Sequence, residues 1–226
     1  AVVVGQGGIG TALIQELQRR APGLQVSGAG RSGAALPLDL TDDASLAAFA
    51  ERLQEHCPLR LVISTAGVLH GPGLQPEKRL AQVRRRALEE SFAVNAFAPL
   101  LLAQAIEPSL SKQQPFHFAS LSARVGSIGD NRLGGWYSYR AAKAAQNQLL
   151  RTLAIEWRRR WPLACVTLLH PGTTATALSA PFRSGVPAEQ LFTPERAAGQ
   201  LLDVIAGQEP ESSGAFLAWD GQPIPW

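Results

Sequence analysis

The chain opens with "AVVVGQGGIG" (residues 1–10), a run of β-branched residues that leads into a turn rich in glycine. Val2, Val3 and Val4 favour a β-strand, because β-branched side chains pack well on a pleated surface. The glycines permit a tight turn, and the residues after them predict a helix that begins near Thr11. A strand that passes through such a turn into a helix is the first half of a β-α-β unit, which indicates an α/β protein.

The rest of the chain repeats this alternation. Further strands are predicted at residues 24–30, 60–65, 115–122, 163–170 and 214–220, and helical stretches around the apolar face of residues 46–53 and at about 78–107, 139–160 and 194–206. Strands that alternate with helices indicate a parallel sheet covered on both faces. No repeat, low-complexity tract or linker divides the chain. We therefore predict one domain over residues 1–226, a Rossmann-type doubly wound parallel sheet in a three-layer α/β/α sandwich.

Composition argues against several other classes of protein. The 226 residues carry a formal charge of only +3, and the short basic runs at 84–86 and 158–160 lie in helical stretches, so we expect solvated faces and no nucleic-acid partner. No apolar run is long enough to span a membrane, so no membrane partner is expected. The two cysteines, Cys57 and Cys165, are far apart and lack metal-ligand spacing. We expect no disulfide framework, no metal site and a cytoplasmic location.

The glycine turn is the first candidate site. Backbone can approach a pyrophosphate closely where glycines stand between a strand and a helix, and the helix N-terminus offers unpaired N–H groups. Placed after a strand at the start of a β-α-β unit, the turn predicts a dinucleotide site. The residues assigned to it are Gly5, Gln6, Gly8, Ile9 and Gly10.

The end of the second strand indicates which dinucleotide is bound. NAD sites usually place a carboxylate there, but residues 27–32 read "SGAGRS" and contain none. Arg31, with Ser32 beside it, could instead bind a 2′-phosphate, so NADPH is favoured over NADH. The alternative is that Arg31 is simply a surface residue. Asp39, followed by Leu40, could accept a hydrogen bond from the adenine amino group or cap the helix that starts after Thr41.

A second candidate site combines residues from three later segments. Tyr139 and Lys143 share one face of a predicted helix, one turn apart. Asn95 lies within an otherwise apolar helix, where its amide must be paired. The segment "ASLSARVG" (119–126) ends a strand in serines at the carboxyl edge of the sheet, where open α/β sheets bind ligands.

Taken in order, these motifs resemble the short-chain dehydrogenase/reductase family. The set comprises the glycine turn, "STAG" (64–67), Asn95, a strand-end Ser, Tyr-x-x-x-Lys (139–143) and "PGTTAT" (171–176), and it covers nearly the whole chain. Within the family, "GVLH" (67–70), "SARVGSI" (122–128), "GGWYSYRAAKAAQNQL" (134–149) and "WDGQPIPW" (219–226) look most like the C-factor and carbonyl-reductase-like branch.

The resemblance implies a role for each catalytic residue. Tyr139 would donate a proton to a substrate carbonyl oxygen. Lys143, together with the positive charge of the oxidised nicotinamide, would lower the pKa of that phenol, and it would also bind the nicotinamide ribose. Ser122 would orient the carbonyl, and Asn95 would hold a water that links Lys143 to solvent.

The same resemblance completes the cofactor site. Pro171 and Gly172 would begin a loop that holds the carboxamide, and Thr176 would hydrogen-bond to it. The full set of cofactor contacts implied is Gly5, Gln6, Gly8, Ile9, Gly10, Arg31, Ser32, Asp39, Leu40, Ala66, Gly67, Asn95, Tyr139, Lys143, Pro171, Gly172, Thr173, Thr174 and Thr176.

The chain departs from the family pattern in three places. Its glycine turn is one residue shorter, with Val4 in place of Thr, and Ser64-Thr65 replaces the usual Asn-Asn. The family also reads Ser-Ser-x-x-Gly at the strand end, whereas Ala123 stands here in the position of the second serine. Ser122 is the favoured substrate-orienting residue through a local shift. The alternatives are Ser120 and a site without this hydroxyl.

The leading hypothesis is therefore an NADPH-dependent reductase of a small aldehyde, ketone or quinone. The alternative is a dinucleotide-binding regulatory or signalling protein, like C-factor, with little or no turnover. Helices at 91–107 and 139–160 often pair between subunits in this family, so a homodimer is the preferred assembly.

Overall fold

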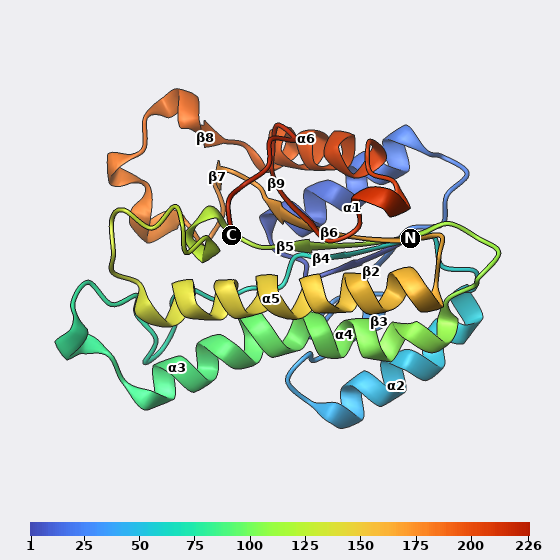
Figure 1. Ribbon diagram of the computed structural model, residues 1–226, viewed down its shortest axis with the longest axis horizontal. Coiled ribbons are helices and arrows are strands. Elements are labelled where there is room, and N and C mark those ends of the chain that lie inside the picture. Colours follow the sequence, from blue (N-terminus) through green and yellow to red (C-terminus); the bar gives the residue numbers. More distant parts are fainter.

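A seven-stranded parallel sheet forms the centre of the computed structural model, which describes residues 1–226 (Figure 1). Its strands are β1 (Val2–Val4), β2 (Ser27–Gly30), β3 (Leu36–Pro37), β4 (Leu61–Ser64), β5 (Phe116–Leu121), β6 (Ala164–His170) and β9 (Ala215–Ala218). They lie in the order β3-β2-β1-β4-β5-β6-β9, and β1 pairs in parallel with both β2 and β4. The strand order reverses beside β1, which is where open α/β sheets bind ligands.

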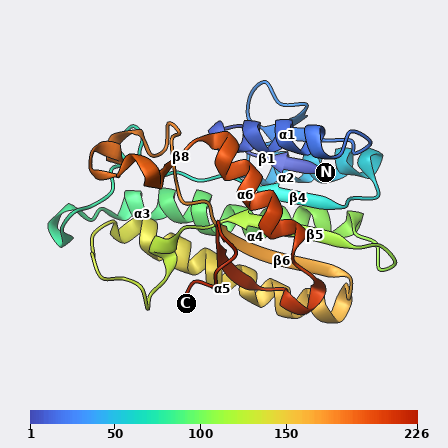
Figure 2. The ribbon, with the colours of Figure 1, turned by 90° about the horizontal axis from the view of Figure 1, so that it is seen from above.

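Helices cover both faces of this sheet (Figure 1). The helices are α1 (Gly8–Arg20), α2 (Asp43–Leu53), α3 (Arg85–Phe92), α4 (Ala98–Ile106), α5 (Tyr137–Arg160) and α6 (Pro194–Ala206). Figures 1 and 2 show α1 and α6 on one face, with α2, α4 and α5 on the other. The predicted doubly wound, three-layer fold is therefore confirmed. None of the helices combines the length and apolar composition that crossing a membrane requires.

Two apolar clusters fill the spaces between the layers. Val2 and Val4 belong to the cluster on the α2–α4–α5 side, whereas Val3 belongs to the cluster on the α1–α6 side. This division follows from the alternation of side chains along a strand. In the first cluster the Trp157 ring meets Phe116 and Phe118 edge-on, at centroid distances of 6.0 and 6.1 Å. A strand buried on both faces needs apolar residues at consecutive positions, which explains the Val run.

Short elements connect these layers. Two-residue strands β7 (Thr173–Thr174) and β8 (Leu191–Phe192) pair in parallel and bring together the ends of the segment 175–190. The 3-10 helices are η1 (Gln54–His56), η2 (Leu80–Gln82), η4 (Glu107–Ser109), η5 (Arg124–Gly126), η6 (Ala180–Gly185), η7 (Ala188–Gln190) and η8 (Pro210–Ser212), and η3 (Ala93–Phe97) is a π-helix. Because β7 directly follows β6, the 175–190 segment lies at the carboxyl edge of the sheet (Figure 1).

The predicted boundaries differ from the observed ones in several places. The first helix begins at Gly8, inside the glycine turn, and not near Thr11. The stretch predicted as one helix at 78–107 is divided by the extended residues 83–84 after η2 and by the π-helix η3. Strand β3 was not predicted, because it has two residues and one of them is a proline.

Candidate active site

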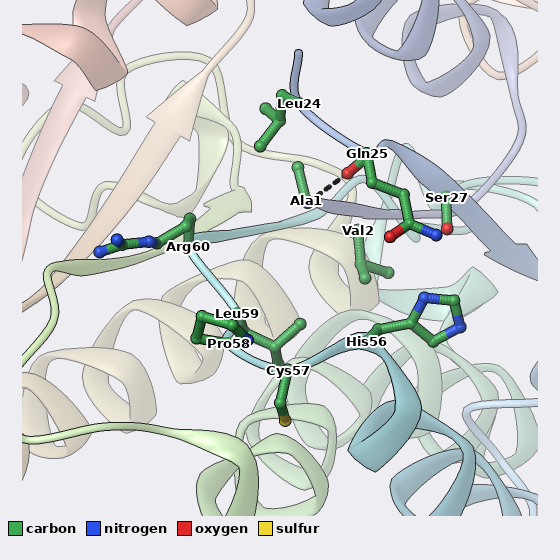
Figure 3. A pocket seen from close by; sticks show the side chains of 10 residues that line it. All are labelled: Ala1, Val2, Leu24, Gln25, Ser27, His56, Cys57, Pro58, Leu59 and Arg60. Carbon is green, nitrogen blue, oxygen red and sulfur yellow. Dashed lines mark hydrogen bonds between the residues drawn. The ribbon is translucent and has the colours of Figure 1, made fainter.

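A cavity of about 600 Å³ lies at the carboxyl edge of the sheet, where the sequence predicts the ligand site. It extends from the ends of β1 and β2 to the end of β5 and the first turns of α5. A smaller pocket of about 180 Å³ lies at the opposite edge, between the start of β1 and residues 56–60 (Figure 3). It contains none of the predicted site residues, so the large cavity is the candidate active site.

The glycine turn forms one wall of this cavity. Gly5 has a φ of 93°, which favours glycine, and a β-carbon on Gly10 would lie 1.8 Å from the Gly5 carbonyl oxygen. The Thr65 hydroxyl donates to the carbonyl oxygens of Val4 and Gly5 at 3.0 and 2.9 Å, and so fixes the turn to the end of β4. No side chain caps α1, and its first turn has no acidic residue. The open N–H groups, without a capping side chain or a carboxylate beside them, fit a dinucleotide pyrophosphate.

Arg31, Ser32, Asp39 and Leu40 line the same cavity beyond the turn. Arg31 is exposed and forms no ion pair within the chain, which leaves its guanidinium free for a ligand. The Asp39 carboxylate accepts hydrogen bonds from the hydroxyl and backbone N–H of Thr41, at 2.7 and 2.9 Å, and these bonds lower the pKa of Asp39.

Asp39 does not cap the following helix. Asp42 is the N-cap of α2, and its carboxylate accepts from the N–H groups of Ala44 and Ser45. The capping alternative for Asp39 is therefore wrong. That alternative assumed a helix that starts directly after Thr41. Helix α2 begins one residue later, at Asp43, because Asp42 has the extended backbone of an N-cap.

Tyr139 and Lys143 lie on the first turns of α5 and line the opposite end of the cavity. Their side chains are close together, with Nζ of Lys143 5.8 Å from the centre of the Tyr139 ring. Both are buried, with 9% and 2% of their surface exposed. Burial lowers the pKa of Lys143 to about 7 and raises the pKa of Tyr139 above its ordinary value. Loss of solvation is the cause of the raised pKa of Tyr139, and the lowering implied by the resemblance, which also involves the charge of an oxidised nicotinamide, stays a prediction.

The strand-end serines have different positions. Ser122 lines the cavity, and its hydroxyl donates to Oδ1 of Asn147 at 2.6 Å. Ser120 is fully buried, does not line the cavity, and accepts a hydrogen bond from Nε2 of Gln146. Of the two alternatives, Ser122 is the one placed where a substrate could reach it.

Asn95 lies beneath the cavity in the π-helix η3, and π-helical turns occur frequently at functional sites. Its Oδ1 accepts from the N–H of Val68 at 3.0 Å, and its Nδ2 donates to the Val68 carbonyl and to the Ser91 hydroxyl. Both amide hydrogens are thus used within the protein. The Asn95 side chain therefore positions the loop after β4 next to Gly67, whose added β-carbon would lie 3.3 Å from Asn95 Oδ1.

A buried carboxylate, Glu77, caps the helix that carries Tyr139. Glu77 is 3% exposed, and it accepts hydrogen bonds from the backbone N–H and the hydroxyl of Ser138. Its own backbone carbonyl accepts from the N–H of Trp136 at 2.5 Å. The Ser91 hydroxyl donates to the Ser138 carbonyl, which connects this cap to Asn95. Sequence reasoning missed Glu77, because it lies 61 residues from Ser138 in the chain.

Only part of the segment after β6 that was predicted to bind the cofactor lines the cavity. Pro171 and Thr176 line the cavity, as do the unpredicted Ala177 and Leu178, whereas Gly172, Thr173 and Thr174 do not. Gly172 packs against Phe192 and Trp219, Thr173 is exposed, and Thr174 is buried. Further lining residues that the sequence did not indicate are Val4, Gly7, Gly30, Leu38, Thr41, Thr65, Val94 and Leu121.

Aromatic rings connect this segment to the catalytic end of the cavity. Phe182 of η6 packs on Trp136 at a centroid distance of 5.1 Å, and Trp136 meets the Tyr139 ring edge-on at 6.2 Å. His70 packs against the same Phe182 ring at 5.9 Å. The 175–190 segment is thus held against the turn that precedes Tyr139.

Comparisons with known proteins agree with this geometry. The family model for short chain dehydrogenase matches residues 10–187. The chain is 32% identical over 190 residues to 1-hydroxy-2-glutathionyl-2-methyl-3-butene dehydrogenase of Rhodococcus sp. (strain AD45), covering 84% of this chain and 78% of that one. It is 35% identical over 170 residues to C-signal of Myxococcus xanthus, covering 75% and 93%. The NADPH-bound carbonyl reductase from chicken fatty liver superimposes with a TM-score of 0.83 at 25% identity, covering 100% and 98%.

Proposed function

Because the chain belongs to the short-chain dehydrogenase family, whose members are oxidoreductases, we propose that it is an NADPH-dependent carbonyl reductase. Its substrate would be a small aldehyde, ketone or quinone, which it reduces to an alcohol. The observation that carries this proposal is the single cavity at the strand-order reversal, which joins the glycine turn and Arg31 to Tyr139 and Lys143.

The bound dinucleotide would supply the hydride, and the chain would supply binding, orientation and the proton. The open N–H groups at the start of α1 would hold the pyrophosphate, while Arg31 and Ser32 would bind a 2′-phosphate. The Tyr139 hydroxyl would donate its proton to the substrate carbonyl oxygen. The Lys143 ammonium would stabilise the phenolate left behind. The Ser122 hydroxyl, which donates to Oδ1 of Asn147 in the free chain, would turn its one hydrogen to the same carbonyl oxygen.

The preference for NADPH rests on Arg31. The end of β2 carries no carboxylate that could bind a ribose 2′-hydroxyl and repel a phosphate there. The fold alone does not decide between the two cofactors, because an NADH-bound 3-ketoacyl-(acyl-carrier-protein) reductase from Brucella melitensis also superimposes, with a TM-score of 0.79 at 18% identity.

A binding titration tests this preference. Arg31→Ala should weaken NADPH binding by about tenfold or more, the loss of one charge-assisted contact to phosphate, and should leave NADH binding nearly unchanged. Arg52→Ala is the matched control, because Arg52 is an exposed arginine outside the cavity. Equal losses for both cofactors would remove Arg31 from the phosphate site.

Turnover tests the reaction. NADPH oxidation is followed with a panel of aldehydes, ketones and quinones for the wild type, Tyr139→Phe and Tyr137→Phe. Loss of the proton donor should lower kcat by about 100-fold or more. Tyr137 is 41% exposed and does not line the cavity, so Tyr137→Phe should retain activity. Equal turnover by the wild type and Tyr139→Phe would refute the assignment of the acid.

A signalling role is the second candidate, and the similarity to C-signal over 93% of that protein favours it. Ala123 in place of the usual second serine is consistent with weak catalysis. The paired Tyr139 and Lys143 argue for an enzyme, since binding alone does not need a proton donor. Tight NADPH binding without turnover of any compound in the panel would favour the signalling protein.

A further inference from the structure

One buried amide, Gln146, contacts the proposed catalytic lysine and has no part in the mechanism above. It lies three residues after Lys143 on α5 and has no exposed surface. The Lys143 ammonium donates to the carbonyl oxygen of Leu121 and to Oε1 of Gln146, both at 2.9 Å. An ammonium has three hydrogens, so these two contacts leave one free for a ligand.

The orientation of the Gln146 amide is determined by its other contacts. Nε2 donates to the Ser120 hydroxyl at 2.8 Å and to the Leu121 carbonyl at 3.2 Å. A reversed amide would direct its NH₂ group at the ammonium and its oxygen at the Leu121 carbonyl, which are both repulsive contacts. Oε1 must therefore point at Lys143.

No negative charge compensates the ammonium. Lys143 has no carboxylate within 4.0 Å, and the only titratable group that faces it is Tyr139, on the same helix. Strand β5 presents the Leu121 carbonyl, and the loop after β4 presents Gly67. Two neutral oxygens thus stabilise the buried charge, and only the one on Gln146 belongs to a side chain.

We propose that Gln146 is a positioning residue, whose amide oxygen fixes Nζ of Lys143 and keeps the lysine in its ammonium form with one hydrogen left for the cavity. The importance of this role for catalysis rests on the proposed function. The contact itself can be tested without it.

The first test measures the pKa of Lys143 directly. The chain has three lysines, Lys78, Lys112 and Lys143, so an NMR titration of ¹³Cε-labelled lysine gives three signals, and Lys78→Arg and Lys112→Arg assign them. Burial already lowers the pKa of Lys143 to about 7. Gln146→Leu removes one acceptor and should lower it by about one further unit.

A second variant and a control make the result specific. Gln146→Glu keeps the size of the side chain, adds a negative charge, and should raise the pKa of Lys143. Gln148→Leu changes an exposed glutamine of the same helix and should leave it unchanged. If Gln146→Leu does not fold, Gln146→Glu decides alone. A Lys143 pKa that does not move in the folded Gln146 variants overturns the proposal.

Turnover provides the second test. If the pKa of Lys143 falls from about 7 to about 6, the ammonium fraction at pH 7 decreases by about fivefold, and kcat should decrease with it. At pH 5.5 most of the lysine is protonated in both proteins, so the difference should shrink from about fivefold to about 1.3-fold. A structural defect would lower activity equally at both pH values, and that result would overturn the positioning role. Failure of the proposed function itself appears separately, as equal turnover by the wild type and Tyr139→Phe.

Discussion

Replacement of Gly10 by alanine is the sharpest test of the glycine turn. The added β-carbon would lie 1.8 Å from the Gly5 carbonyl oxygen, about 1.2 Å closer than the 3.0 Å that real β-carbons keep. Backbone and not a flexible side chain would have to move, and the turn is fixed to β4 by Thr65. The overlap should cost about 3 kcal/mol or more, against about 1 kcal/mol gained from the better helix propensity of alanine.

The net loss of about 2 kcal/mol should lower Tm by roughly 4–8 °C in a domain of this size. Widening the turn also displaces the N–H groups of the first turn of α1, so the Kd for NADPH should rise by about tenfold or more. Both quantities are measured by differential scanning calorimetry and a fluorescence titration. Gly23→Ala is the control, because its φ is not positive, no atom lies within 4 Å of its β-carbon position, and it lies outside the cavity. If the two variants had the same Tm and the same Kd, the close approach of Gly10 to Gly5 would be refuted.

Three further predictions concern separate parts of the molecule. Ser122→Ala should lower kcat by about 10- to 100-fold with an unchanged Kd for NADPH, and full activity would show that another group orients the substrate. Glu77→Ala should reduce the free energy of unfolding in urea by about 1–3 kcal/mol, because the first turn of α5 loses its cap. Glu77→Gln should reduce it less. Equal stability of the wild type and both variants would contradict the capping role of Glu77. Burial lowers the pKa of His117 to about 4. Below about pH 6.5 this histidine is therefore protonated in the unfolded chain but still neutral in the folded chain, and the free energy of unfolding decreases as the pH falls. The free energy of unfolding should fall by about 2 kcal/mol from this residue between pH 6.5 and 5, and His117→Gln should flatten that slope.

Residues close together in the sequence carried most of the information about the fold. The Val run before the glycine turn predicts a strand buried on both faces, and the structure places Val3 and its neighbours Val2 and Val4 in opposite clusters. The boundaries were less predictable. Helix α1 begins at Gly8 because the turn requires Gly10 close to Gly5, and this contact overrides the low helix propensity of glycine.

The candidate site likewise contains residues that could be paired from the sequence and residues that only the tertiary structure places. Tyr139 and Lys143 could be paired from their spacing alone, since residues four apart share one face of a helix. The sequence favoured Ser122 over Ser120 but left both open, because residues two apart point to the same side of a strand and only the end of β5 decides which one meets the cavity. The loop contacts assigned to Thr173 and Thr174 also depended on the course of the chain after β6, which the pairing of β7 with β8 determines.

The sequence by itself determined the alternation of strands and helices, the glycine turn and the Tyr139–Lys143 pair, because periodicity and short spacings are local properties of the chain. Only the tertiary structure decided that Glu77 caps α5 and that Gln146 contacts both Lys143 and β5. Those contacts join segments that are 61 and 26 residues apart, and they exist because the sheet brings the ends of its strands to one edge.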